Sequence, residues 1–146
     1  MLFKLTGILF FIFKDIKDEN ILINPATLAI KILDLGSATY TNNIPSTLFY
    51  GTKKFASPEC AQGLPYQLGH QEVWALGSLL YVMLFKADPF RDEKEIVGLE
   101  IDRKIRRQRV TISKEAEDAI VSMMSKDPLE RITIPDVLNL KFCKDV

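Results

Sequence analysis

Hydrophobic residues fall into short runs separated by polar breaks, and the pattern predicts one hairpin and several helices. Two β-branched and leucine-rich runs, 21–23 and 29–33, flank the turn-forming sequence Asn-Pro-Ala-Thr at 24–27, which predicts a β-hairpin. Residues 71–85 (QEVWALGSLLYVMLF) are apolar nearly all round. We therefore expect a buried helix there, too short to span a bilayer.

Three further helices are predicted toward the C-terminus. Residues 92–99 form a short amphipathic segment, and 113–126 begin with serine, a good N-cap. Residues 133–140 begin with threonine followed three positions later by aspartate, which favours a capped helix start. The second of these helices has a core-facing stripe with helical spacing, formed by Ala116, Ala119, Ile120 and Met123.

The first twelve residues, MLFKLTGILFFI, are apolar with one lysine. One interpretation is the hydrophobic region of a signal peptide, but a small-residue cleavage site is missing and the run leads directly into polar residues. The other interpretation, which we favour, is a buried helix tail and strand leading into the next segment. A membrane-spanning helix needs nearer 20 apolar residues, so we expect no membrane association.

Composition describes an ordinary globular domain. The 146 residues are 47% hydrophobic and carry zero formal net charge, as expected of one domain with a real core. Cys60 and Cys143 have no metal-ligand or redox spacing, which indicates unpaired thiols in a reducing compartment, the cytoplasm or nucleus. The single histidine, His70, is expected at the surface or at a helix start. We expect a monomer.

A cluster of basic residues at 103–109 could bind nucleic acid or acidic partners. The neutral whole-chain charge and the lack of interleaved aromatic residues favour a solvated face instead. We therefore expect no nucleic-acid partner.

Candidate chemistry lies at both ends of the predicted hairpin. Asp15, Lys17 and Asn20 precede its first strand, and Asp34 follows its second. A hairpin brings its ends together, so two carboxylates, an amide and an ammonium should converge. Such a set suits a phosphoryl group with a divalent metal: carboxylate and amide oxygens bind Mg²⁺, and the lysine neutralises the moving charge. The aspartate at 15 can accept a proton from a hydroxyl or aim it. The alternative is a surface hairpin with scattered charges.

These residues resemble a known family, the eukaryotic protein kinases. The sequence FKDIKDEN at 13–20 is similar to the kinase catalytic loop, and Asp34-Leu35-Gly36 to the metal-binding triplet. The resemblance implies that Asp15 is the catalytic base, that Asn20 and Asp34 hold Mg²⁺, and that Leu22 lies beneath the adenine of ATP. The lysine at 17 is typical of serine/threonine kinases, and the sequences at 15–23 and 31–38 are most similar to those of PIM and PAS-domain kinases.

The resemblance extends further along the chain. Residues 34–59 are similar to the activation segment, in which Thr52 would hydrogen-bond Asp15 and Lys17. Glu72 stands where the family has an aspartate that ties the catalytic loop from below; because it is one methylene longer, we expect strain or a shift. Finally, the resemblance implies a buried ion pair between Glu59 and Arg131, since burying one charge alone would be costly.

We expect an α+β fold, the mainly α-helical C-lobe of a protein kinase with a small β-hairpin at its active site. A glycine-rich loop and a strand lysine are not found before Asp15, so we expect 1–146 to be a single partial kinase domain without the N-lobe that clasps the nucleotide. Activity of this chain alone is expected to be negligible.

Two functions stay open. The first is transfer of the ATP γ-phosphate to serine or threonine of protein substrates, with Asp18 and Glu19 hinting at basic residues before the target. The second is a catalytically silent module that binds partners, as suggested by Phe13, Lys14 and Glu72, which depart from the family pattern.

Overall fold

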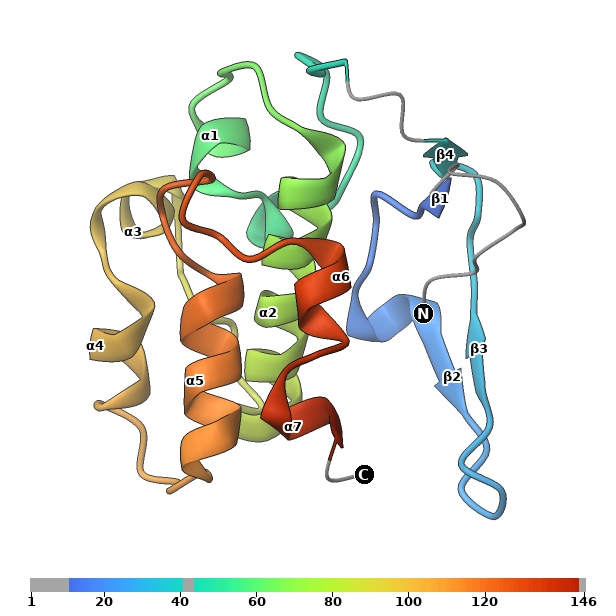
Figure 1. Ribbon diagram of the computed structural model, residues 1–146, viewed down its shortest axis with the longest axis vertical. Coiled ribbons are helices and arrows are strands. Elements are labelled where there is room, and N and C mark those ends of the chain that lie inside the picture. The colour runs from blue at the N-terminus through green and yellow to red at the C-terminus, as the bar shows by residue number, and fades with distance from the viewer. Residues whose placement is uncertain (1–10, 41–43, 145–146) are drawn as a thin grey trace.

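The computed structural model describes residues 11–40 and 44–144, and helices dominate them (Figure 1). The mainly helical α+β fold expected from the sequence is confirmed, with strands confined to two small sheets. In chain order the elements are β1 Phe11–Ile12, the 3₁₀ helix η1 Asp18–Asn20, β2 Ile21–Ile23, β3 Ile30–Ile32, β4 Thr39–Tyr40, the 3₁₀ helix η2 Lys53–Phe55, α1 Pro58–Ala61, α2 Leu68–Phe85, α3 Glu93–Gly98, α4 Ile101–Ile105, α5 Lys114–Met123, α6 Ile134–Val137 and α7 Lys141–Lys144.

Helix α2 is the centre of the fold, with α5 packed along it, α3 and α4 on one side and the β2–β3 hairpin on the other (Figure 1). It is buried nearly all round, as its sequence predicts, and Trp74 and Tyr81 have no exposed surface. The helix begins at Leu68, three residues before the predicted start, because Leu68 packs on the core. His70 therefore lies in the first helical turn and not before the helix. Lys86 ends α2 in a left-handed conformation (φ 54°).

Two predicted helices end differently from expectation. Helix α5 starts as predicted, because Ser113 Oγ accepts a hydrogen bond from the backbone N–H of Ala116 at 3.2 Å. It stops at Met123 and not at 126, because Met124 leaves helical geometry (φ −110°, ψ 28°). Of the predicted helix at 133–140 only Ile134–Val137 is helical, as α6, and α7 begins after it at Lys141. The start of α6 is fixed by the Thr133 N–H, which donates to Asp136 Oδ2 at 2.9 Å.

The predicted hairpin is present as β2 and β3, paired antiparallel with Ile21 opposite Ile32. Its turn is held by Asn24, whose side-chain oxygen accepts from the backbone N–H groups of Ala26 and Thr27, an arrangement typical of asparagine. A second sheet pairs β1 with β4. Its strand β1 covers only the end of the apolar lead-in at 1–12, and the helix tail expected before it lies outside the described residues.

Among the residues that the structure describes, no helix combines the length and the apolar character needed to cross a membrane. Both cysteines are free, Cys60 buried and Cys143 exposed. The basic cluster at 103–109 lies in and after α4, with Arg103, Arg106, Arg107 and Arg109 exposed.

Candidate active site

The backbone just before Asp15 is fixed from below by α2. Backbone N–H groups of Phe13 and Lys14 donate to Glu72 Oε1 at 2.9 Å and Oε2 at 3.1 Å. Glu72 is only 6% exposed. Burial raises the pKa of Glu72 above its usual value, against the opposing effect of these two hydrogen bonds. Although its side chain is one methylene longer than that of aspartate, Glu72 thus makes both hydrogen bonds directly. The backbone of Lys14 takes a left-handed conformation (φ 65°).

The Asp15 carboxylate is the most heavily contacted group of the site. Its Oδ1 accepts from the Thr52 backbone N–H at 2.9 Å and from the Thr52 hydroxyl at 2.7 Å. Its Oδ2 lies 2.9 Å from Lys17 Nζ and 3.2 Å from Asn20 Nδ2. Lys17 Nζ also donates to the Thr52 hydroxyl at 2.9 Å. The contacts of Thr52 that the resemblance implied are therefore present.

These contacts set the charge state of the pair. Burial raises the pKa of Asp15, but the hydrogen bonds from Lys17 and Thr52 outweigh it and leave that pKa below its usual value. The pKa of Lys17 is raised, chiefly by its hydrogen bond to Asp15, with smaller effects from nearby carboxylates that include Asp34. Both side chains are therefore ionised at neutral pH.

Asn20 and Asp34 lie at the same end of the hairpin. The Leu33 N–H donates to the Asn20 carbonyl at 2.8 Å, which places Asp34 beside Asn20 across the strands. Asn20 Nδ2 donates to Asp15, both to its carbonyl and to its carboxylate. Its amide oxygen accepts no hydrogen bond from the described residues, and an oxygen of this kind can coordinate a cation. Asp34 Oδ1 accepts a hydrogen bond from the Gly36 N–H at 3.1 Å.

The donor set of Asn20 and Asp34 fits Mg²⁺. Within the described part of the chain, no three His, Cys, Asp or Glu side chains form a metal-binding group, so a protein-only cage is not available there. Mg²⁺ usually binds one or two protein oxygens and takes its remaining ligands from water and phosphate. One carboxylate and one amide oxygen at the hairpin end meet that requirement.

Leu22, expected beneath the adenine ring, is 53% exposed on the hairpin. It lies opposite Lys31 in the pairing of β2 with β3. Other large apolar side chains of the hairpin region are similarly uncovered in the described structure, namely Ile23, Leu28, Ile30, Leu33 and Leu35.

The far end of the predicted activation segment is fixed by an ion pair. Arg131 Nη1 and Nη2 lie 2.7 Å and 3.0 Å from the two carboxylate oxygens of Glu59. The side chain of Arg131 has no exposed surface, and that of Glu59 is 8% exposed. Burial raises the pKa of Glu59, but the hydrogen bonds and charge of Arg131 outweigh it and hold that pKa below its usual value. The pairing implied by the resemblance is present.

Two contributors to the site were missed in the sequence. Gln71 holds the same segment, since its Oε1 accepts from the Ser57 N–H at 2.8 Å and its Nε2 donates to the Phe55 carbonyl at 2.9 Å. The sequence offered one signal for this role, namely the position of Gln71 at the start of the predicted buried helix 71–85. Gly51 packs against the backbone just before Asp15, where an added Cβ would lie 2.7 Å from the Lys14 carbonyl oxygen.

Comparison with known proteins gives a consistent result. A family model described as protein kinase domain matches residues 8–143. The chain is 38% identical over 129 residues to the serine/threonine-protein kinase PSK1 of Saccharomyces cerevisiae, covering 88% of this chain and 9% of that protein. It is 36% identical over 135 residues to the serine/threonine-protein kinase ppk6 of Schizosaccharomyces pombe, covering 92% and 17%.

A mouse protein, the PAS domain-containing serine/threonine-protein kinase of Mus musculus, is 32% identical over 130 residues, covering 87% of this chain and 9% of that protein. The chain thus spans less than one fifth of the length of each of these three relatives. The similarity to PAS-domain kinases that the sequence indicated is confirmed.

Proposed function

We propose, on the premise that this chain belongs to the protein kinase family, that it takes part in transfer of the ATP γ-phosphate to serine or threonine of protein substrates. The observation that carries the proposal is the convergence on Asp15, whose carboxylate contacts Thr52, Lys17 and Asn20 at once. Catalysis of phosphoryl transfer depends mainly on positioning the reactants and compensating their charge. Asp15 can position the acceptor hydroxyl, and Lys17 can compensate negative charge.

Asp15 would receive the acceptor hydroxyl. Its ionised carboxylate can accept a hydrogen bond from a substrate hydroxyl and aim the oxygen at the γ-phosphorus of ATP. It can take the proton as the new O–P bond forms and the bond from that phosphorus to the leaving ADP breaks. A lowered pKa makes Asp15 a weak base, so aiming is the larger part of its role. Lys17, charged and held beside it, would neutralise negative charge on the transferred group.

Asn20 and Asp34 would hold the metal. Bound Mg²⁺ would supply positive charge to the phosphate oxygens of ATP. The amide oxygen of Asn20 and the carboxylate of Asp34 would orient that ion at the end of the hairpin, next to Lys17. Leu22, exposed on the same hairpin, would contact the adenine from one side.

A second candidate is a catalytically silent module that binds proteins. The uncovered apolar side chains of the hairpin, Leu22, Ile23 and Leu28 among them, favour it. Against it stands the full set of contacts at Asp15, which hold an ionised carboxylate where an acceptor hydroxyl would bind.

A chimera distinguishes the two candidates. The nucleotide-binding N-terminal half of the PSK1 kinase domain would be fused to this chain, and transfer of radiolabelled phosphate from ATP to a serine peptide preceded by basic residues would be measured with Mg²⁺. We expect transfer, and we expect Asp15→Asn or Asp34→Ala to abolish it. Asp118→Asn, which removes a charge from the exposed face of α5, is the matched control. A chimera that folds but transfers no phosphate would support the silent module.

The chain without its fusion partner is the second arm of the experiment. We expect no transfer from it, because the nucleotide contacts that the family makes from outside this part of the fold are missing in that sample. Transfer by the unfused chain, abolished in Asp34→Ala, would contradict this expectation.

A further inference from the structure

Lys126 lies in the turn that follows α5, and its side chain packs against two aromatic rings of the core. Its Nζ lies 4.9 Å from the centre of the Trp74 ring and 4.1 Å from the centre of the Phe90 ring. The two rings are buried and stacked, with their centres 5.9 Å apart. Nζ also donates a hydrogen bond to the Ile96 carbonyl of α3. The amine therefore connects α2, α3 and the segment between them.

The surroundings of this amine compensate a positive charge poorly. An ammonium group has three N–H donors, and the Ile96 carbonyl is the one oxygen that accepts from Lys126 in the part of the chain that the structure describes. Within that part, no carboxylate forms an ion pair with Lys126. The Arg131 guanidinium lies 5.1 Å from the centre of the same Trp74 ring, so a second cation is close by.

Burial therefore favours the neutral form of the Lys126 amine. It lowers the pKa of Lys126 to about 8, against the exposed Glu100 carboxylate, which favours the ammonium, and with a smaller effect of Arg131 in the same direction as burial. The ring faces attract a cation, but they also exclude the water that would otherwise solvate it. At pH 8 about half of such an amine is neutral, whereas an amine of pKa about 10.5 is neutral in roughly one molecule in 300.

A neutral primary amine at the surface can act as a nucleophile. Lys126 is partly exposed, and Asp127 and Leu129, which follow it, are exposed. An acyl thioester is a suitable electrophile. The nitrogen attacks the carbonyl carbon and the C–N bond forms, while the C–S bond breaks with its electron pair on sulfur. The proton lost by the nitrogen passes to the departing thiolate. The product is an amide, which carries no charge.

We propose that Lys126 is a modification site at which an acyl thioester transfers its acyl group to the side-chain amine, and that loss of the positive charge weakens the attachment of α3 to the core. Acylation removes the cation from Trp74 and Phe90 and adds a bulkier group next to the Ile96 carbonyl. The modification is a property separate from phosphate transfer and does not depend on it.

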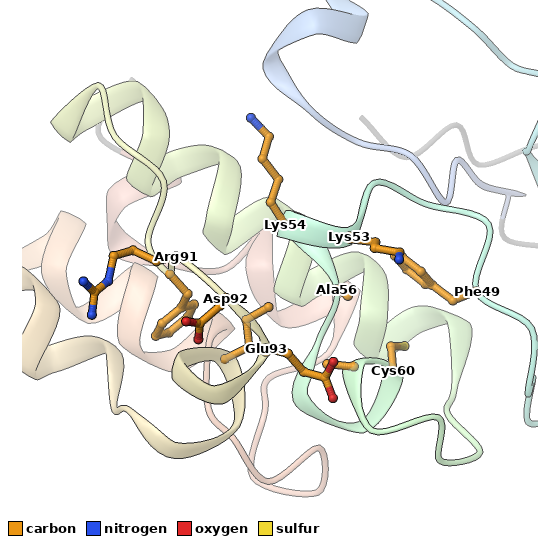
Figure 2. A pocket seen from close by; sticks show the side chains of 11 residues that line it. Phe49, Lys53, Lys54, Ala56, Cys60, Arg91, Asp92 and Glu93 are labelled. Carbon is orange, nitrogen blue, oxygen red and sulfur yellow. The ribbon is translucent and has the colours of Figure 1, made fainter.

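The residues that Lys126 contacts also line a groove on the surface. Phe90 and Ile96 belong to the lining of this groove, which encloses about 590 Å³. Lys53 lies on one side of it and Asp92, at the start of α3, on the other (Figure 2). A change at Lys126 therefore reaches the groove through two side chains or backbone groups that it contacts directly.

The first test is acetylation of the 146-residue chain by acetyl-coenzyme A at pH 8, with the occupancy of each lysine followed over time by peptide mass spectrometry. Exposed Lys144 of α7 is the internal reference. We expect Lys126 to react about fivefold to twentyfold faster, because lower nucleophilicity and partial burial offset much of the roughly 150-fold gain in neutral amine. In concentrated urea the two rates should become equal. Equal rates in the folded chain, or a slower rate at Lys126, would overturn the proposal.

A charge variant tests whether the surroundings of Lys126 determine its reactivity. Glu100→Gln removes the carboxylate that favours the ammonium, so acetylation of Lys126 at pH 7 should become about twofold faster. Glu93→Gln removes an exposed charge from the first turn of α3 and is the matched control. Its rate at Lys126 should equal that of the unsubstituted chain. A Glu100→Gln rate no faster than that of Glu93→Gln contradicts the proposal.

The second test measures hydrogen exchange of the α3 amides. Lys126→Gln removes the charge as acetylation does, whereas Lys126→Arg keeps it. We expect the α3 amides to exchange about threefold faster or more in Lys126→Gln and in the acetylated chain, and at an unchanged rate in Lys126→Arg. The weakened attachment of α3 is overturned if acetylation leaves this exchange unchanged, or if Lys126→Arg increases it as much as Lys126→Gln does.

Discussion

Loss of the Glu59–Arg131 pair is expected to be the most damaging single change in this chain. Removing one partner of a buried ion pair costs about 3–5 kcal/mol, because the other charge is left buried without compensation. Unfolding entropy of about 2.1 cal/mol/K per residue gives roughly 0.3 kcal/mol/K for the 146 residues. The melting temperature should therefore fall by about 10–16 °C.

The two single variants should differ in severity. Arg131 also donates to the carbonyls of Ser125 and His70, each at 3.0 Å, and its guanidinium lies over the ring of Trp74. Arg131→Met loses these contacts and leaves the Glu59 carboxylate buried without a partner. Glu59→Gln leaves the Arg131 guanidinium without its carboxylate, but the guanidinium keeps its two carbonyl partners. The loss of stability should therefore be smaller than in Arg131→Met. The double variant should be more stable than Arg131→Met alone, because no unpaired charge stays buried.

Thermal unfolding followed by circular dichroism measures these shifts at pH 7. Lys114→Met is the control, since Lys114 pairs with Asp118 on the exposed face of α5, and its melting temperature should match that of the unsubstituted chain. The lowered pKa of Glu59 sets the pH window: the stabilisation is complete above the usual value of 4.5 and is lost as pH falls through the lower folded value. Equal shifts in Arg131→Met and Lys114→Met would refute the reasoning.

Three further changes test the contacts around the candidate base. Glu72→Gln should destabilise the chain by about 1–3 kcal/mol in chemical denaturation, because an amide has one acceptor oxygen and leaves the N–H of Phe13 or of Lys14 without a partner. An unchanged denaturation midpoint would contradict this. Thr52→Ala removes a hydrogen bond that lowers the pKa of Asp15. The acidic limb of the chimera's pH–rate profile should therefore move to higher pH. A profile that stays in place would show that Asp15 is not the titrating group. Gly51→Ala should cost about 1–3 kcal/mol by overpacking, whereas Gly98→Ala, with open space around its added Cβ, should not.

The pattern of hydrophobic and turn-forming residues predicted those parts of the fold that depend on contacts between residues close in sequence. The hairpin follows from two β-branched runs around a sequence that turns by hydrogen-bonding Asn24 to its own backbone. Convergence of Asp15, Lys17 and Asn20 follows because all three precede the same strand. The Glu59–Arg131 pair spans 72 positions, and only the family resemblance linked the two residues.

Other features depend on contacts that leave no periodic signal. The β1–β4 sheet has two residues in each strand, too few for an alternation to be recognised. The start of α2 at Leu68 was set by packing and not by a cap, because the N-cap residue Gln67 makes no side-chain hydrogen bond. The groove at Lys53 joins residues from η2, α1 and α3, which only the tertiary structure brings together.

Glu72 and Gln71 are consecutive on α2, yet each grips a different part of the molecule. One binds the peptide groups ahead of Asp15, and the other binds those ahead of Glu59. A helix moves as a stiff body, so any rotation of its N-terminal end displaces the backbone before Asp15 and the backbone before Glu59 together. The two cannot drift apart unless a side chain of this dipeptide releases its partner.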